Sequence, residues 1–541
     1  MGYWGTQLNR HLTWWPYSAP WHQYLARCQF MLQQGRPVND VLVYPGRIAW
    51  IPSDEVQAGP FRQVVLDDVA LMERIWVKED GRIEVQGGGD FAAITLTPGL
   101  ALRPESLRKI RELVLAGATL IGEAPPGESS SLENWPECDR EIADLIDELW
   151  SGEGSSELHE LSYGKGRILA TTELIEALDR ITGGPDLQFI DESGKGHPDL
   201  FRKEPEYAPD ESLLPQPGVQ VNAITDKALE SMDFTHRRDG EVDIYFVCNT
   251  GDDTLKLICD FRVDGREPEV WDPVTGQIKD SAIWKRQDGR TEVAMQFAPR
   301  QSLFVVFRIR TNRNSSETLG TSERFGKQTT SADIIKQLDG PWSVTFDQKW
   351  GGPAQVVVQD ELEDWTKLND KAINYYSGSA LYQKSFDVST VPSGVSYIDI
   401  GEVYNLARVT LNDRELGVIW TAPWRLQIPA GLLKEKSTEF TSLTKSNILK
   451  IEVANTWVNR LIGDEQEPED CPLVEWSPAN RKGSYDINVN SRGLKDLPDW
   501  LIHGDERPSK GRYTFTSWRF YDKNAPLSPS GLLGPVQLLS E

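Results

Sequence analysis

The chain has 541 residues and a formal net charge of −25, with 39% hydrophobic and 26% charged residues. This composition is typical of a globular protein, and the length predicts three or four domains. The acidic charge argues against a nucleic-acid partner and against an anionic membrane surface, because there is no basic field to release counterions.

Residues 5–44 predict a polar loop, a helix and a strand, which together form one unit of an α/β fold. Ser18 is a candidate N-cap, and Gly35 is a candidate stop for the helix. One apolar face follows the helical repeat and consists of Trp21, Tyr24, Leu25, Cys28 and Leu32. Residues 38–44 predict a short buried strand, and we expect its sheet neighbours to lie outside this sequence.

The loop before this helix carries Asn9, Arg10, Trp14 and Trp15. Aromatic faces stack on the C–H side of a pyranose, and amide and guanidinium groups reach its hydroxyls. These residue types therefore predict a sugar-binding surface. The alternative is that the tryptophans belong to a hydrophobic core and Arg10 lies at the surface or in an interface.

The next 160 residues alternate between strand and helix patterns. Helices are predicted at residues 68–73 and 104–116, between strands at 63–66, 91–96 and 119–122. Strand, helix and strand in this order give right-handed parallel units. We therefore predict a flavodoxin-like α/β domain over residues 60–222, of which residues 184–222 read as a connecting loop.

The remaining chain predicts two antiparallel domains joined by a polar linker. Short alternating strands between turns predict a small β-sandwich over residues 223–312. Residues 313–336 are poor in apolar residues and predict a linker. Residues 337–541 predict a jelly roll with a turn at Asn412-Asp413 and a long loop over residues 471–513.

Several stretches of the chain match one enzyme family in the same order. They read LNRHLTWW, PWHQYLARCQFMLQQG and VNDVLVYPG near the start, then FTHRRDGEVDIYFVCNT, LDGPWSVTFDQKWGGP, VANTWVNRLIGDE and SGLLGPV. They resemble glycoside hydrolase family 106, the α-L-rhamnosidases. The resemblance implies that residues 1–59 are a remnant of the C-terminal end of a (β/α)8 catalytic barrel, most of which lies outside this sequence.

The resemblance also implies the roles of the other domains. The flavodoxin-like domain is similar to accessory domains that lie beside the barrel in many glycoside hydrolases. The C-terminal domain is similar to the galactose-binding-like, sugar-binding domain of family 2 glycoside hydrolases. Family members are usually periplasmic or secreted, whereas no signal peptide precedes Gly5, which predicts a cytoplasmic protein as encoded.

Glycoside hydrolysis needs two carboxyl groups across the scissile bond. Family resemblance implies that these are glutamates on barrel strands, and we assign no catalytic residue in this chain. Asp40 is the only carboxylate between residues 5 and 44, and we predict that it contacts substrate or supports residues that do.

A second candidate site lies in the C-terminal domain. Asn, Trp and Arg offer stacking and hydrogen bonds to a sugar, and two carboxylates add oxygen ligands that suit Ca²⁺. The residues are Asn455, Trp457, Asn459, Arg460, Asp464 and Glu465. The alternative is that Asn459 and Arg460 tie down the long loop. Trp420 and Trp424 form a shallow sugar platform or pack beneath this loop.

His236, Arg237 and Arg238 precede a predicted strand. The family resemblance implies that this stretch approaches the barrel, which predicts an interdomain or active-site role, and the alternative is a basic cluster at the surface. The leading interpretation of the chain is the C-terminal part of a rhamnosidase-like enzyme that acts on rhamnose-containing glycans and is inactive alone. One alternative is a split enzyme, in which a separately encoded barrel fragment docks on residues 1–46. The other is a carbohydrate-binding protein that uses the jelly roll. We expect residues 1–46 to dock partly through their helix, with a mobile Gly2–Trp15 loop.

Overall fold

The computed structural model describes residues 10–46, 58–151, 160–190, 231–280, 283–309, 333–436, 446–471, 473–475, 492–516 and 519–540. The chain divides into two compact units. The first consists of Met1–Gln23 and Lys327–Glu541, and the second of Tyr24–Gly326. Helix α1 spans Ala19–Leu32, which confirms the predicted first helix. The border between the two units falls inside this helix.

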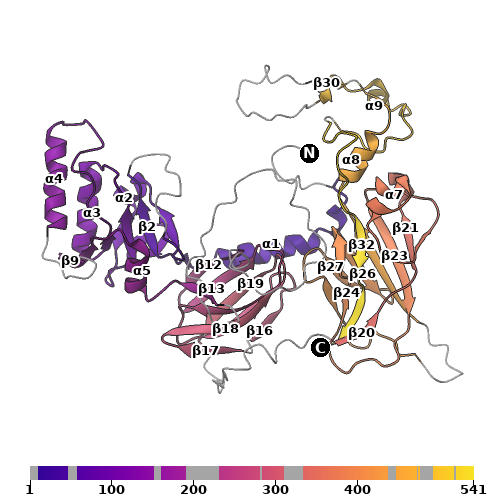
Figure 1. Cartoon of the computed structure of the whole chain (residues 1–541), viewed down its shortest axis with the longest axis horizontal. Helices are drawn as coiled ribbons and strands as arrows, with labels where there is room; N and C mark the ends of the chain where they lie inside the picture. Colours follow the sequence, from indigo (N-terminus) through magenta and orange to yellow (C-terminus); the bar gives the residue numbers. More distant parts are fainter. Residues whose placement is uncertain are drawn as a thin grey trace. The chain divides into compact units, whose positions relative to one another are not determined.

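A six-stranded sheet organises the α/β domain of the second unit (Figure 1). Its strands lie in the order β3 (Gln63–Val65), β2 (Val41–Tyr44), β7 (Ala93–Leu96), β8 (Thr119–Ile121), β10 (Gly166–Leu169) and β9 (Glu160–Tyr163). All neighbours are parallel except β9 and β10. A small antiparallel sheet contains β4 (Ile75–Val77), β5 (Ile83–Val85) and β6 (Gly89–Phe91).

Four helices lie in the described part of this domain: α2 (Asp68–Glu73), α3 (Pro104–Ala116), α4 (Glu137–Trp150) and α5 (Leu174–Thr182). In α3 the residues at helical spacing, Leu107, Ile110, Leu113 and Val114, are all buried in one core with Leu42 and Leu120. Gly117 ends α3, as predicted. The parallel strands and amphipathic helices agree with the predicted α/β architecture.

Strand β2 overturns the barrel interpretation of residues 38–44. It pairs in parallel with β3 on one side and with β7 on the other, and all four of its residues are buried. The strand itself was predicted correctly, because a continuous apolar run suits burial on both faces. Its expected isolation was wrong: β2 is an interior strand of the α/β domain, so the barrel remnant cannot extend through it to residue 59.

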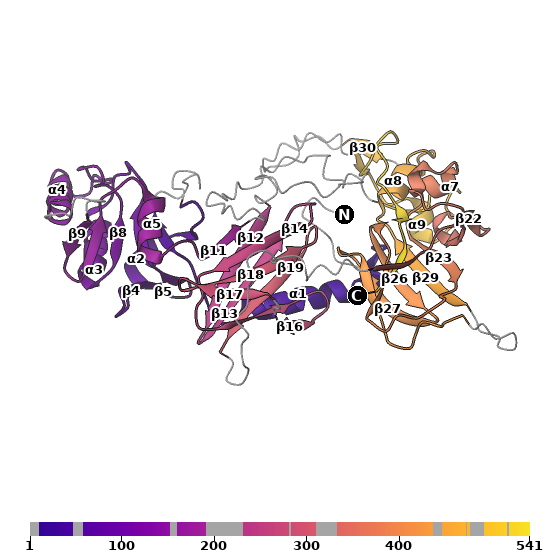
Figure 2. The ribbon, with the colours of Figure 1, turned by 60° about the horizontal axis from the view of Figure 1, so that its bottom comes forward.

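The second domain of this unit consists of two antiparallel sheets (Figure 2). One contains β1 (Arg36–Pro37), β12 (Met232–Asp239), β13 (Val242–Asn249), β19 (Ser302–Arg308), β15 (Glu267–Trp271) and β16 (Ile278–Asp280). The other contains β11 (Leu187–Ile190), β14 (Leu255–Phe261), β18 (Arg290–Phe297) and β17 (Trp284–Gln287). Tyr245, Phe261 and Phe307 meet in the core that the two sheets share.

The boundaries of this sandwich differ from residues 223–312. Strand β1 comes from the predicted barrel remnant, and β11 comes from the predicted connecting loop. Both add to sheet edges through pairing with distant strands, which sequence periodicity does not reveal. Residues 191–230 lie outside the described part of the chain.

The C-terminal half of α1 packs on the outer face of the larger sandwich sheet. Cys28 and Met31 share an apolar cluster with Ile244, Phe304 and Val306. The Tyr24 hydroxyl lies 2.8 Å from Ser302 Oγ. The predicted docking of the first segment through its helix is therefore confirmed for the sandwich.

The C-terminal β domain of the first unit is built from two main antiparallel sheets. One orders β22 (Val357–Gln359), β21 (Trp342–Phe346), β23 (Ser379–Phe386), β29 (Asn447–Ala454), β26 (Leu406–Leu411) and β27 (Arg414–Ile419). The other orders β20 (Asp333–Gln337), β33 (Gln537–Ser540), β24 (Ser396–Asp399) and β28 (Arg425–Ile428). β25 (Glu402–Tyr404) pairs with β32 (Gly531–Gly534). The jelly-roll topology itself stays a prediction.

Asn412 and Asp413 both have positive φ between β26 and β27, as a tight hairpin turn requires. Trp342, Trp365 and Tyr382 are fully buried in the core of the domain. β20 takes up the end of the predicted linker by pairing with β33, and residues 310–332 lie outside the described part.

Short elements lie around these sheets. They are the 3₁₀ turns η1 (Trp15–Tyr17), η2 (Gln348–Trp350) and η3 (Trp365–Lys367), helices α7 (Lys371–Asn374), α8 (Val458–Asp464) and α9 (Asp499–His503), and the paired strands β30 (Leu473–Glu475) and β31 (Arg492–Leu494). The last pair and α9 fall within the predicted long loop of residues 471–513.

Candidate functional site

The start of the described chain is held on the C-terminal β domain. The Thr13 hydroxyl donates to the Asn455 carbonyl, and the Trp457 indole donates to the His11 carbonyl over 2.7 Å. Arg408 donates to the Pro16 carbonyl over 3.2 Å, and its guanidinium lies 4.6 Å from the centre of the Tyr17 ring. Residues 11–17 are thus placed by specific contacts, and the predicted mobile loop is wrong for this part of it.

Apolar packing reinforces these hydrogen bonds. Tyr17 is buried in a small cluster with Leu406 and Ala454, and Trp14 and Trp420 pack against that cluster. The prediction that Trp14 and Trp420 contact sugar therefore competes with an observed packing role. Burial of an aromatic ring at such a contact stabilises the loop by removing apolar area from water.

Three aromatic side chains beside this cluster belong to none of the hydrophobic cores of the described structure. The Trp15 and His22 ring centres are 5.6 Å apart at an interplanar angle of 83°, and those of Trp21 and His22 are 5.0 Å apart at 73°. Trp14 touches both tryptophans. All three rings are partly exposed. Trp15, Trp21 and His22 form what we call the aromatic surface; Arg10 is exposed, and Asn9 lies outside the described residues.

His22 is oriented by the turn of helix that precedes it. Its Nδ1 atom lies 2.9 Å from the Ser18 carbonyl oxygen, which also accepts the backbone N–H of His22 over 3.0 Å. Ser18, predicted as an N-cap through its side chain, instead donates its hydroxyl to the Trp15 carbonyl over 2.8 Å. Ser18 therefore contacts two residues of the aromatic surface: its hydroxyl binds the main chain of Trp15, and its carbonyl orients the His22 ring.

The second candidate site has mostly structural contacts. The Asn459 side chain donates to the Ser528 carbonyl over 2.8 Å and accepts the Ser528 N–H over 2.8 Å. Asn455 donates to the Tyr376 carbonyl and to the Ser530 hydroxyl. Both amides are almost completely buried, so they anchor α8 and the loop before β32. These contacts favour the alternative that Asn459 ties down a loop.

Arg460 and Asp464 are partners on one face of α8. The Arg460 Nε atom donates to Asp464 Oδ1 over 3.0 Å, and the guanidinium lies 4.8 Å from the Tyr513 ring centre. Asp464 also accepts the backbone N–H groups of Tyr513 and Thr514 and the Thr514 hydroxyl. Each carboxylate oxygen therefore has two donors, and Asp464 has no obvious remaining site for a cation.

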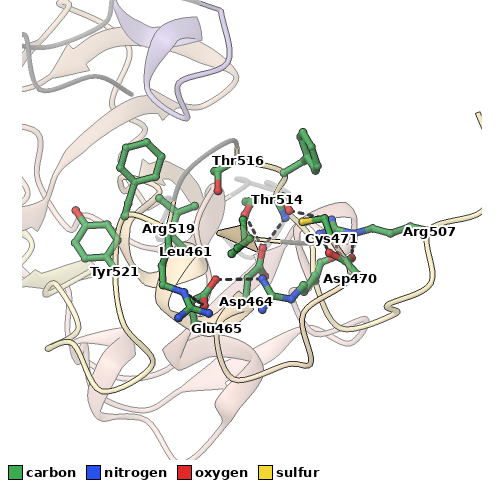
Figure 3. Close-up of a pocket in the computed structure, with 14 residues that line it drawn as sticks. Leu461, Asp464, Glu465, Asp470, Cys471, Arg507, Thr514, Thr516, Arg519 and Tyr521 are labelled. Carbon is green, nitrogen blue, oxygen red and sulfur yellow. Dashed lines mark hydrogen bonds and ion pairs between the residues drawn. The ribbon is translucent and has the colours of Figure 1, made fainter. Parts of the chain in front are cut away.

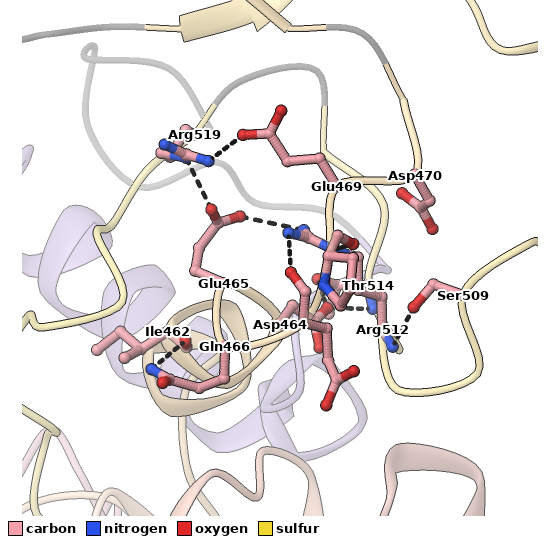
Figure 4. A network of polar contacts seen from close by, with 12 residues as sticks. Ile462, Asp464, Glu465, Gln466, Glu469, Asp470, Ser509, Arg512, Thr514 and Arg519 are labelled. Carbon is pink, nitrogen blue, oxygen red and sulfur yellow. Dashed lines mark hydrogen bonds and ion pairs between the residues drawn. The ribbon is translucent and has the colours of Figure 1, made fainter.

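Glu465 is held by two arginines that were not among the predicted site residues (Figure 4). Arg512 and Arg519 lie 3.1 and 2.7 Å from its two oxygens, and Arg519 also bridges to Glu469. We call Arg460, Asp464, Glu465, Arg512 and Arg519 the Asp464 network. No group of three or more His, Cys, Asp or Glu side chains that could hold a metal ion is found among the described residues. The Ca²⁺ site stays a prediction.

A hollow opens beside this network (Figure 3). Asp464 and Glu465 lie side by side in its lining, and the Asp470–Arg507 ion pair lies to one side. Its volume is about 30 Å³, which is room for a few water molecules at about 10–15 Å³ each. The charged side chains of its lining already have partners. The hollow is therefore a poor candidate for a sugar site.

The other predicted site residues of this domain, Trp457 and Trp424, use part of their surface for contacts within the protein. The Trp457 ring makes an edge contact with Trp350 at 4.7 Å in addition to its bond to His11. Trp424 is partly buried and packs against the main core of the β domain. A sugar platform at Trp424 stays a prediction, with less free area than the sequence alone suggested.

Asp40 is 1% exposed and belongs to a buried network of the second unit. Its carboxylate accepts the Arg62 backbone N–H over 2.8 Å and pairs with Arg262 over 2.6 Å. Burial raises the pKa of Asp40, although the charge of Arg262 opposes the shift. The side chain ties the start of β2 to the sandwich, and a substrate contact at Asp40 stays a prediction.

His236 lies at the centre of the same network. Its Nδ1 atom is 2.8 Å from Asp186 and its Nε2 atom is 2.9 Å from Asp243, and all three side chains are buried. Carboxylates only accept, so both ring nitrogens donate and the ring is an imidazolium. Burial alone would lower the pKa of His236, but the charges and hydrogen bonds of Asp186 and Asp243 raise it.

Further contacts complete what we call the His236 network: Asp40, Asp186, His236, Asp243, Tyr245, Arg238, Arg262 and Arg266. Tyr245 stacks on His236 at 3.9 Å and donates its hydroxyl to Asp186 over 2.9 Å. Arg238 and Arg266 both pair with Asp243. The network links Asp40 of the α/β domain to the sandwich through Arg262, which pairs with both Asp40 and Asp186. The predicted approach of residues 236–238 to the barrel stays a prediction.

Comparison with known proteins gives these sites a family context. The sequence model of the alpha-L-rhamnosidases, glycoside hydrolase family 106, matches residues 1–208 and 206–284, more than half of the chain. The chain belongs to this family.

Two proteins extend the family 106 comparison over the whole chain. The structure of the rhamnosidase from Novosphingobium sp. PP1Y matches with a TM-score of 0.72 and 27% identity, over 99% of this chain and 42% of that one. A Formosa agariphila protein named "Putative beta-glucuronidase" is 23% identical over 762 residues, covering 99% of this chain and 58% of that protein. The chain thus spans less than two thirds of the length of either protein. Among the described helices, none is long and apolar enough to cross a membrane.

Some of the residues that organise these family 106 sites were missed by the sequence reasoning. His22 was passed over although it is one helical turn from Ser18, a spacing that could have signalled a side chain bonded to the preceding turn. Asp186, Arg507 and Arg512 lie in stretches that were predicted as loops, and no element was predicted for the stretch around Arg519. Their partners are remote in sequence, so no local pattern could have found them.

Proposed function

We propose that this chain is the C-terminal part of an α-L-rhamnosidase-like glycoside hydrolase that acts on rhamnose-containing glycans. Within this enzyme, the chain binds carbohydrate at the aromatic surface of Trp15, Trp21 and His22. Arg10, a predicted sugar-binding residue, lies close to Trp15 in the sequence. The observation that carries the proposal is that these rings lie outside the hydrophobic cores, although Trp14, which contacts both tryptophans, packs against one of them. Family membership supplies the class of ligand.

We further propose that the chain alone does not hydrolyse rhamnosides. Inversion or retention at a glycosidic carbon needs two suitably placed carboxyl groups. The described residues before Asp40 include no Asp or Glu, and Asp40 is engaged by Arg262. A barrel supplied in the same or a separate polypeptide would provide the missing pair, which keeps the split-enzyme alternative open.

Two further alternatives have specific support. The name of the Formosa agariphila relative favours a uronic acid in place of rhamnose. The resemblance of the C-terminal domain to sugar-binding domains favours binding at Trp424. In that case Trp424→Ala would weaken binding by on the order of 1 kcal/mol, the free energy that one aromatic contact typically contributes.

Calorimetric titration of the full chain with methyl α-L-rhamnoside tests the proposal. We expect Trp15→Ala to weaken binding by on the order of 1 kcal/mol, because one stacking face is lost. Trp135→Ala is the matched control, since Trp135 is 63% exposed on the α/β domain and belongs to no proposed site. Equal affinities for wild type and Trp15→Ala would remove the aromatic surface from carbohydrate binding.

An aryl α-L-rhamnoside assay on the same purified chain tests the catalytic part. We expect no turnover above the spontaneous rate. Clear turnover that Asp40→Ala abolishes would contradict the proposal and would give Asp40 a catalytic role despite its burial.

A further inference from the structure

The orientation of His22 determines which of its nitrogens faces a ligand. The Ser18 carbonyl oxygen can only accept hydrogen bonds, so His22 Nδ1, 2.9 Å away, must carry the hydrogen. The backbone N–H of His22 binds the same oxygen, so the side chain and main chain of His22 are held by one atom. In the neutral ring this arrangement leaves Nε2 with a lone pair and no hydrogen.

The other side of the imidazole is free to meet a ligand. No hydrogen-bond partner of His22 Nε2 is found among the described residues, and the ring is partly exposed. The rings of Trp15 and Trp21 stand at 83° and 73° to the imidazole plane. A hydrogen-bond acceptor is therefore placed among aromatic rings, the combination that a pyranose uses through its hydroxyls and its C–H face.

We infer that His22 is a specificity-determining residue of the aromatic surface, an inference that rests on the proposed carbohydrate binding. Its Nε2 lone pair accepts a hydrogen bond from a sugar hydroxyl. The same lone pair opposes a carboxylate, which is also an acceptor. The surface consequently selects a neutral pyranose, such as a 6-deoxyhexose, over a uronic acid, and so discriminates between the two sugar classes that the names of the relatives suggest.

Two variants separate this role from a structural one. His22→Leu removes the acceptor, and we expect methyl α-L-rhamnoside binding to weaken about tenfold, the worth of one hydrogen bond. His22→Gln places an amide that can accept or donate near the position of Nε2. We expect it to keep rhamnoside affinity within about threefold and to lose the preference over methyl β-D-glucuronide. Circular dichroism checks that each variant folds.

A second readout tests the tautomer without any ligand. Nitrogen-15 NMR of the full chain labelled at its six histidines, with His22→Gln as the assignment variant, should show hydrogen on Nδ1 of neutral His22. Hydrogen on Nε2 would overturn the inference. So would unchanged rhamnoside affinity in His22→Leu when Trp15→Ala binds more weakly, because carbohydrate binding would then stand without His22. If wild type binds neither sugar, the proposed function itself falls.

Discussion

The His236 network and the Asp464 network both stabilise buried carboxylates, but they do so with different cations. Each buries carboxylates, and a buried carboxylate is tolerated only when it is paired and hydrogen-bonded. Around Asp464 and Glu465 the partners are arginines and backbone N–H groups. Around Asp186 and Asp243 a buried imidazolium joins the arginines.

This difference determines how each network responds to pH. Arginine keeps its charge at any physiological pH, whereas histidine is the side chain that titrates near neutrality. The Asp464 network is therefore expected to be insensitive to pH around neutrality, and the junction between the α/β domain and the sandwich is expected to be sensitive. Three substitutions can break or sharpen this comparison.

The largest effect is expected for Asp243→Ala. Asp243 is fully buried and faces His236, Arg238 and Arg266, so the variant leaves three cations without their shared anion. Loss of one partner from a buried ion pair costs about 3–5 kcal/mol. Hydrogen–deuterium exchange should show this loss of protection in β12 and β13.

Asp252→Ala is the control for that measurement. Asp252 pairs with Arg300 at the surface of the same sandwich, with both side chains more than half exposed. Exposed pairs contribute about 0–1 kcal/mol. If Asp243→Ala were as mild as Asp252→Ala, the His236 network would contribute little to the junction.

A slightly smaller effect is expected for Asp464→Ala in the first unit. The variant leaves the buried Arg460 without its carboxylate partner and removes the acceptor of the Tyr513 and Thr514 N–H groups. We expect a loss of about 3 kcal/mol, seen as faster exchange in α8 and residues 512–514. Glu467→Ala, at an exposed position three residues along the chain, should leave both segments unchanged. Protection that survived Asp464→Ala would show that packing alone holds α8.

The smallest effect concerns pH and the variant His236→Gln. The raised pKa of His236 gives stability that is complete below pH about 6.5, its unfolded value, and that is lost as pH rises through the folded pKa. Above pH about 6.5 the slope is up to about 1.4 kcal/mol per pH unit. The pKa values of Asp186 and Asp243 are lowered, because His236 outweighs the effect of burial, so their contribution is lost only at acid pH.

Exchange protection of β12 and β13 at pH 6, 7 and 8, corrected for intrinsic rates, measures this slope. It should fall with pH in wild type and be flatter in His236→Gln, while protection of α8 stays constant in both. Parallel slopes in the two proteins would assign the pH dependence to another group.

Local patterns predicted elements well and their partners poorly. The apolar run of residues 41–44 signalled a buried strand, and the structure has one. Its neighbours β3 and β7 could not be inferred, because many apolar strands fit any interior position of a parallel sheet. The family resemblance then placed the strand in a barrel, where the pairing excludes it.

The candidate sites divide in the same way. Asn459 and Arg460 were recognised as unusual polar residues, and both prove to be buried. Whether they bind a sugar or a loop depended on Ser528 and Tyr513, which lie 50 or more residues further along the chain. Trp15 and His22 stand seven residues apart, and only the backbone path between them determines that their rings meet.

The bond between Thr13 and Asn455 joins residues separated by 442 positions, and this has a consequence for how the protein is made. Residues 24–326 form one unit, whereas the other combines a segment before them with Lys327–Glu541. During synthesis the inserted unit can fold as soon as it emerges, as domains generally do. The segment of residues 11–17 must wait until β26 and β29 have left the ribosome, so its tryptophans are exposed longest. Docking of residues 11–17 on the C-terminal β domain is therefore expected to be among the last steps of folding.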